Sequence, residues 1–125
     1  MTIRVNKEVP AHVANRLQAT LWREAIHLVS EGVASVEDVD KAITAGPGLR
    51  WAVMGPHMLF NLGSGGHGMD VFCERFGASF HRWWDDLGAP QLTTEVATML
   101  SAGVRAEEWG RSFTSLSRER DAKIV

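Results

Sequence analysis

The sequence contains no tyrosine, a single cysteine and no long apolar run. One cysteine, Cys73, excludes an internal disulfide and a cysteine-based metal site, and it favours a reducing compartment. No stretch of about 18 apolar residues is present to cross a bilayer, and the first residues lack the apolar segment of a secretion signal. These absences favour a cytoplasmic protein without membrane association.

An excess of positive charge is also missing, since 13 Lys and Arg residues face 15 Asp and Glu residues. Nucleic-acid-binding proteins need a basic excess to displace counterions, so we expect no nucleic-acid partner, through a helix-turn-helix module or otherwise. The five histidines lack the paired spacing of a zinc site, so we expect no bound metal. The glycine-rich residues 63–68 lack the Lys-Ser/Thr pair of a phosphate-binding loop and are predicted to be a connector.

Most of the chain has the apolar spacing of α-helices. The longest stripe covers about residues 11–31, whereas residues 83–90 have no clear pattern. Residues 2–7 alternate like a strand but have no second strand to pair with. We therefore predict an all-α domain of about six helices over residues 10–125, preceded by an extended interdomain segment, residues 1–9. Further stripes predict helices at about residues 36–45, 56–62, 69–80, 93–102 (ended by Gly103) and 107–123.

Large side chains raise two expectations about burial. Cys73 shares an apolar helix stripe with Phe72 and Phe76, which predicts a buried, inert thiol. The chain has five tryptophans, and because this side chain is seldom hidden completely, some of the rings are expected to line a cleft or a subunit interface. Trp83 and Trp84 are adjacent, and one of them is expected to meet a partner subunit.

Two short segments carry the candidate site residues. The pair Asn15-Arg16 lies on the first turns of the longest predicted helix, where an amide is expensive to bury without a partner. Asn15 either bonds to a neighbouring loop or orients a substrate hydroxyl, since an amide donates and accepts without titrating. Between two glycine turns, Arg50 either caps a helix or binds an anion, and Trp51 either fills the core or stacks on a cation.

The chain resembles the C-terminal domain of the 3-hydroxyacyl-CoA dehydrogenases. The form Gly-Pro-Gly-Leu-Arg-Trp-Ala at residues 46–52 is most similar to the branch of carnitine dehydrogenase, gulonate dehydrogenase and lambda-crystallin. The family commonly has Gly-Phe where this chain has Ala11-His12, which makes His12 a candidate substrate contact in place of an aromatic wall. The other matching motifs are Glu8-Val9-Pro10, Asn15-Arg16, Leu21-Trp22-Arg23-Glu24-Ala25, Glu31-Gly32-Val33-Ala34-Ser35, Gly68-Met69 and Phe76-Gly77.

This resemblance implies a helical bundle of the type found in the C-terminal domain of 6-phosphogluconate dehydrogenase. It further implies part of an NAD-dependent dehydrogenase, with Asn15 beside the reactive end of a small 3-hydroxy substrate. NAD and the catalytic His–Glu pair would belong to an N-terminal domain outside this chain, and the helical domain would form a homodimer. The substrate stays open among an acyl-CoA thioester, carnitine and a sugar acid. We expect Met1 to mark the boundary of a segment of a longer protein and not a native start. We also expect the isolated chain to have no dehydrogenase activity.

The alternative is a non-catalytic helical module that dimerises or binds a small ligand. Helices rich in Leu, Met, Phe and Trp bury well against a twofold mate, so both hypotheses predict self-association. They differ at Asn15 and Arg50. Both side chains should face an open cleft if the domain serves an active site, and both should be satisfied internally if the domain is only structural.

Overall fold

The computed structural model describes residues 1–124, and the regular structure in them is helical throughout. This confirms the predicted all-α fold. The described part has seven helices because residues after Gly46, predicted as a turn, form the short α3. Residues 2–7 are not a strand, since no neighbouring strand offers backbone partners. The helices are α1 (His12–Ser30), α2 (Val36–Ala45), α3 (Pro47–Val53), α4 (Pro56–Gly63), α5 (Met69–Asp86), α6 (Thr94–Glu108) and α7 (Phe113–Lys123).

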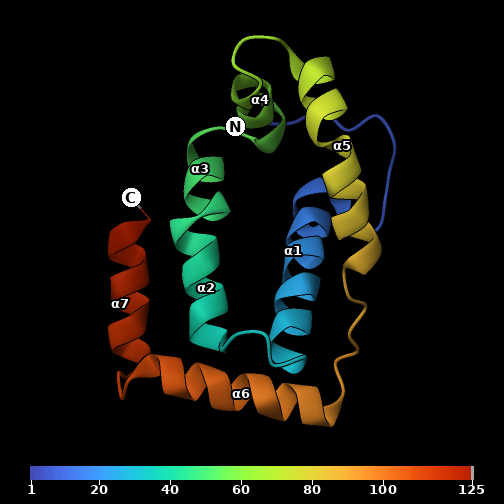
Figure 1. The fold of residues 1–125 in the computed structure, drawn as a ribbon. Coiled ribbons are helices and arrows are strands. Elements are labelled where there is room, and N and C mark those ends of the chain that lie inside the picture. Colours follow the sequence, from blue (N-terminus) through green and yellow to red (C-terminus); the bar gives the residue numbers. More distant parts are fainter. Residues whose placement is uncertain (125) are drawn as a thin grey trace.

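The helices form a frame rather than a closed bundle (Figure 1). α1 and α2 run antiparallel, and α6 crosses below both and packs on them. α3 continues upward from α2, on which it packs, and leads to α4. α4 and α5 pack on each other and form an arm at the end opposite α6.

The buried core is small and lies where α1, α2 and α6 meet. Its apolar members are Ile26 from α1 and Val36 and Val39 from α2. α6 comes so close to α2 that a Cβ on Gly103 would lie 2.8 Å from the Cβ of Val36. The sequence predicts that Gly103 ends its helix. This prediction is wrong, because α6 continues to Glu108. The glycine allows two helices to approach each other instead of ending one.

α5 differs from the sequence prediction in its length and in the exposure of its apolar face. It continues to Asp86, so Trp83 and Trp84, predicted to be irregular, are helical. Cys73 is exposed, which contradicts the predicted burial. Its apolar stripe has no second layer of helices over it, because α5 packs chiefly on α4. The last helix begins at Phe113 rather than near residue 107.

Aromatic rings hold the arm together. Phe60 of α4 stacks on Phe72 of α5, with ring centroids 5.0 Å apart and planes inclined by 8°. Farther along α5, Phe80 meets Trp83 edge to face at 5.2 Å. Such pairs contribute about 0.5–1.5 kcal/mol beyond their buried area. The arm therefore has an aromatic cluster of its own, partly exposed and separate from the buried core between α1, α2 and α6.

Candidate functional site

The first turns of α1 place Asn15 at the edge of an open recess. Residues three, four and seven positions apart lie on the same face of a helix. On α1 these residues are Asn15, Gln18, Ala19 and Trp22, and together they line a recess of about 300 Å³. One helix face thus presents two amides and an indole to the same space.

The side chain of Asn15 is exposed and forms no hydrogen bond with another side chain or backbone group among residues 1–124. Its acceptor and both donors are therefore available to a ligand. Exposed asparagines are common on protein surfaces, so what marks this one is its place beside Trp22 on one helix face. The position suits a substrate-orienting amide, and this role stays a prediction.

His12 is the first residue of α1 and is exposed. Both Ala11 (φ 64°) and His12 (φ 53°) have left-handed backbone conformations. These conformations are costly for residues other than glycine. His12 does not line the Asn15 recess. The structure therefore does not place its imidazole beside the amide.

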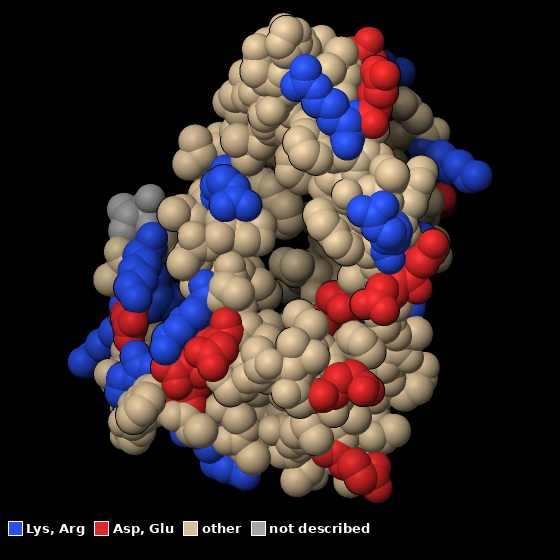
Figure 2. Space-filling model, in the orientation of Figure 1, with Lys and Arg blue, Asp and Glu red and all other residues tan. Residues whose placement is uncertain are grey.

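Arg50 and Trp51 lie on α3 and are both exposed. The guanidinium of Arg50 forms no ion pair or hydrogen bond in the described part of the chain, so it is not a helix cap. Neither residue lines the recess at Asn15. Figure 2 shows the molecular surface hollowed between α1 and α3, with mostly uncharged atoms around the hollow. The candidate anion and cation contacts are thus exposed but separate from the amide.

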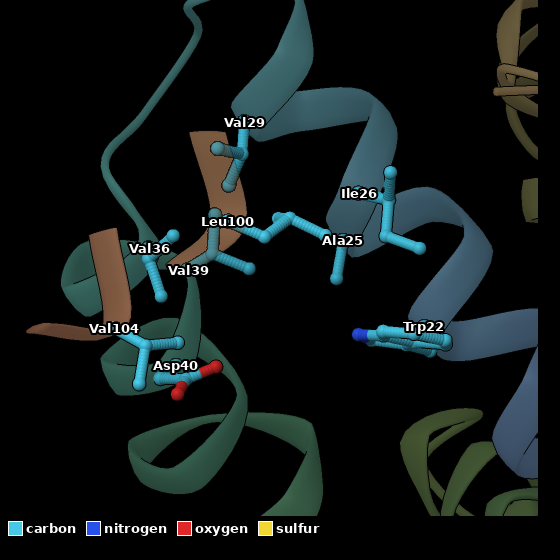
Figure 3. Close-up of a pocket in the computed structure, with 9 residues that line it drawn as sticks. All are labelled: Trp22, Ala25, Ile26, Val29, Val36, Val39, Asp40, Leu100 and Val104. Carbon is cyan, nitrogen blue, oxygen red and sulfur yellow. The ribbon is translucent and has the colours of Figure 1, made fainter. Parts of the chain in front are cut away.

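Trp22, which the sequence does not mark as a site residue, borders two spaces. It closes one end of the Asn15 recess and also lines a smaller pocket of about 160 Å³ between α1, α2 and α6. Its indole and the carboxylate of Asp40 lie on opposite sides of this pocket, and apolar side chains fill the wall between them (Figure 3). The spacing of seven residues from Asn15 is the sequence signal that places Trp22 on the same helix face.

Charged groups gather around the junction of α2, α6 and α7. Lys41 pairs with Glu37 at 2.7 Å, and the indole N–H of Trp109 donates to Glu37 at 3.2 Å. The hydrogen bond from Lys41 is the main reason that the pKa of Glu37 is lowered. Burial, followed by repulsion from Asp40, raises the pKa of Glu107. These contacts fasten the end of α6 to α2 rather than to the Asn15 recess.

Residues 1–124 contain neither a metal-binding cluster nor a membrane-spanning helix. No three His, Cys, Asp or Glu side chains there are grouped so that they could hold a metal ion. None of the helices in the same residues has the length and apolar character needed to traverse a bilayer.

Residues 12–98 match the family described as 3-hydroxyacyl-CoA dehydrogenase, C-terminal domain. The chain is 47% identical to the L-carnitine dehydrogenase of Streptomyces coelicolor over 123 residues, which are 98% of this chain and 39% of that protein. It is 43% identical to the L-carnitine dehydrogenase of Bacillus cereus over 97% of its length and 37% of the relative. The chain thus spans about two fifths of the length of these curated relatives.

Proposed function

The chain belongs to the family of 3-hydroxyacyl-CoA dehydrogenase C-terminal domains, and we propose that it forms the substrate-facing and dimer-forming domain of an NAD-dependent dehydrogenase. That enzyme moves a hydride between the secondary alcohol of a small 3-hydroxy substrate and NAD. The observation that carries the proposal is the exposed, unpaired amide of Asn15 in an open recess. Residues 10–125 would be this domain, and residues 1–9 the link to the domain that holds NAD.

L-carnitine is the proposed substrate, because the curated relatives quoted above are named for its oxidation. Its hydroxyl suits the amide of Asn15, which orients an alcohol without changing protonation state. Its carboxylate suits the guanidinium of Arg50, and its trimethylammonium group suits the indole of Trp51. Because both residues lie on α3 outside the Asn15 recess, these two contacts require α3 to approach α1 in the complete enzyme. His12 is proposed to border the same substrate where the family commonly has an aromatic side chain.

The residues of this chain do not fit NAD. A dinucleotide site needs a glycine-rich turn between a strand and a helix, and residues 1–124 contain no strand. We therefore assign the cofactor to a region that corresponds to the remaining length of the relatives. The single cysteine is the reason for proposing the cytoplasm as the compartment.

A non-catalytic dimerisation or ligand-binding module is the second candidate. It is favoured by the open frame and the many exposed apolar side chains, which suit association with another protein. It assigns no role to the shared helix face of Asn15 and Trp22, which the dehydrogenase proposal uses. A measurement of dehydrogenase activity distinguishes the two functions directly.

The test is a chimera in which this chain replaces the matching part of the Streptomyces coelicolor L-carnitine dehydrogenase. We expect L-carnitine-dependent reduction of NAD. Asn15→Ala should lower kcat by about 100-fold, as the loss of one preorganised donor does elsewhere. Asn6→Ala is the matched control, since Asn6 is also exposed but lies in the extended segment.

Three results would count against the proposal. A folded chimera without NAD reduction contradicts the dehydrogenase function. Equal activity of the Asn15→Ala and Asn6→Ala chimeras contradicts the role of the recess. The chain by itself should reduce no NAD, and a measurable rate from the purified 125-residue protein contradicts the assignment of the cofactor to another domain.

A further inference from the structure

The recess on α1 has two ends and a floor. Asn15 lies at one end, and Trp22 lies at the other, about 10.5 Å farther along the helix axis. Ala19 lies between them, and its short side chain leaves the middle of this helix face open. Long side chains on a helix lean toward its N-terminus, so the indole of Trp22 leans over this floor toward Asn15. With a volume of about 300 Å³, the recess has the size of a small-molecule site.

An aromatic face is the feature of the recess that can attract a charge. No Lys, Arg, Asp or Glu side chain lines the recess. Figure 3 shows the indole of Trp22 edge-on, with its nitrogen turned toward the pocket that Asp40 also lines. That pocket therefore meets the positive edge of the ring, which leaves a negative face for the recess. Trp22 keeps 53% of its surface exposed, so a ligand can reach this face.

The distance along α1 suits a small substrate that carries a cation close to its alcohol. In L-carnitine the quaternary nitrogen is bonded to the carbon next to the alcohol carbon. A hydrogen bond from the Asn15 amide to the alcohol spans about 2.9 Å, and a cation binds within about 6 Å of an indole centroid. Joined by this short stretch of substrate, the two contacts match the rise of about 10.5 Å between Asn15 and Trp22.

We propose that Trp22 is a specificity-determining residue, which binds the trimethylammonium group of the substrate on one face of its indole. This role rests on the dehydrogenase function proposed above and assigns one end of the Asn15 recess. A quaternary ammonium group has no N–H to donate, and aromatic cages are the usual sites for it. Trp22 is the wall already in place on α1. Trp51 is the second wall, which arrives when α3 approaches α1.

The other lining amide distinguishes a methylated cation from an apolar acyl chain as the ligand of this indole. Gln18 is exposed and lies one helical turn after Asn15 in the same recess. An apolar chain laid over this amide would remove it from water without giving it a partner, which is costly. The polarised C–H groups of a trimethylammonium ion can instead contact the amide oxygen. Gln18 and Trp22 together therefore favour the cation.

The experiment measures the binding of two ligands to the chimera defined above by calorimetry. NADH is present throughout, so that no hydride leaves the alcohol. One ligand is L-carnitine. The other is its neutral analogue, in which a tert-butyl group replaces the trimethylammonium group and keeps its shape. The difference between the two ligands reports the contribution of the positive charge.

Trp22→Leu keeps an apolar side chain but removes the ring. It should raise the Kd of L-carnitine about 10-fold and change the Kd of the neutral analogue less than about 3-fold. Trp22→Phe keeps an aromatic face, so its Kd for L-carnitine should stay within about 3-fold of the parent value. Trp83→Leu is the matched control, because Trp83 is 57% exposed on α5, outside the recess. It should change neither Kd.

Two results overturn the proposal. An L-carnitine Kd that is indifferent to Trp22→Leu leaves Trp51 as the aromatic contact of the cation. An equal loss of both ligands shows that Trp22 contributes apolar surface or support for the recess, and not a site for positive charge.

Turnover separates this proposal from the dehydrogenase function. Trp22→Leu should raise KM for L-carnitine with little change in kcat, because the ammonium contact is the same before and during hydride transfer. Asn15→Ala should lower kcat instead. A chimera that binds L-carnitine through Trp22 but reduces no NAD contradicts the dehydrogenase function alone. An active chimera whose Kd and KM do not depend on Trp22 contradicts the cation site alone.

Discussion

The carboxylate of Glu24 accepts a hydrogen bond from the backbone N–H of Gly88 at 2.9 Å. The neighbouring Arg23 donates its Nε–H to the carbonyl oxygen of Gly88 at 3.0 Å. Two side chains of α1 therefore hold both polar groups of one residue that follows α5. Because α5 packs chiefly on α4, this double contact is a principal attachment of the arm to α1.

Loss of the Glu24 carboxylate should loosen this attachment. A partly buried hydrogen bond to a charged group contributes about 2 kcal/mol, so we expect Glu24→Ala to lower the free energy of unfolding by about that amount. Urea denaturation followed by circular dichroism measures the change. Glu74→Ala is the control, because Glu74 is exposed on α5. Equal effects of the two substitutions would show that the contact does not hold the arm.

Local signals in the sequence account for the helices and several of their ends. The hydroxyl of Ser35 accepts from the N–H of Asp38 at 3.1 Å, as its capping pattern predicts. Thr93 caps α6 in the same way, accepting from the N–H of Val96 at 3.2 Å. Apolar spacing likewise predicts α1 and most of α5. These features depend only on residues within one helical turn, so a sequence suffices to predict them.

Features that depend on packing between helices were not predictable in this way. Gly103 is read as a helix end from the sequence, but its role is set by the distance to Val36 on another helix. Cys73 belongs to an apolar stripe, but no helix of the same chain covers that stripe. At the site, the family motif identifies Asn15, whereas the separation of Arg50 from the recess depends on where α3 lies.

A pair of glycine substitutions tests the close approach of α6 and α2. Alanine forms helix better than glycine by about 1 kcal/mol, and a Cβ on Gly77 of α5 would meet open space. We therefore expect Gly77→Ala to raise the free energy of unfolding by about 0.5–1 kcal/mol. Gly103→Ala should lower it by about 1–3 kcal/mol, because the added methyl group overlaps Val36. Thermal unfolding measures the stability of both variants. Changes of the same sign in the free energy of unfolding would contradict the close contact between Gly103 and Val36.

Backbone strain before α1 gives another prediction. Ala11 has φ 64°, a conformation that costs an alanine about 1 kcal/mol and a glycine almost nothing. Ala11→Gly should raise the free energy of unfolding by about 0.5 kcal/mol, since the freer unfolded chain offsets part of the relief. Ala14→Gly, inside α1, should lower it by about 1 kcal/mol. Chemical denaturation compares the two, and a loss of stability in both would contradict the strain at Ala11.

The carboxyl group of Glu107 should oppose folding at neutral pH. Burial, followed by repulsion from Asp40, raises its pKa above the ordinary value of 4.5. The folded state therefore favours the protonated form, and stability decreases as the pH rises from 4.5 through the pKa of the folded state. Glu107→Gln should raise the free energy of unfolding at pH 7, by less than about 1 kcal/mol because solvent reaches this group.

The same comparison at acid pH completes the test, since the gain from Glu107→Gln should vanish once the pH is below 4.5 and the native carboxyl is neutral. Glu119 is the opposite case, because the hydrogen bond from Lys123 lowers its pKa. Glu119→Gln should therefore reduce stability at pH 7, and its effect should disappear as the pH falls through the folded-state pKa. Urea denaturation across this range measures both variants. A pH-independent gain from Glu107→Gln would show that side-chain shape, not charge, is responsible.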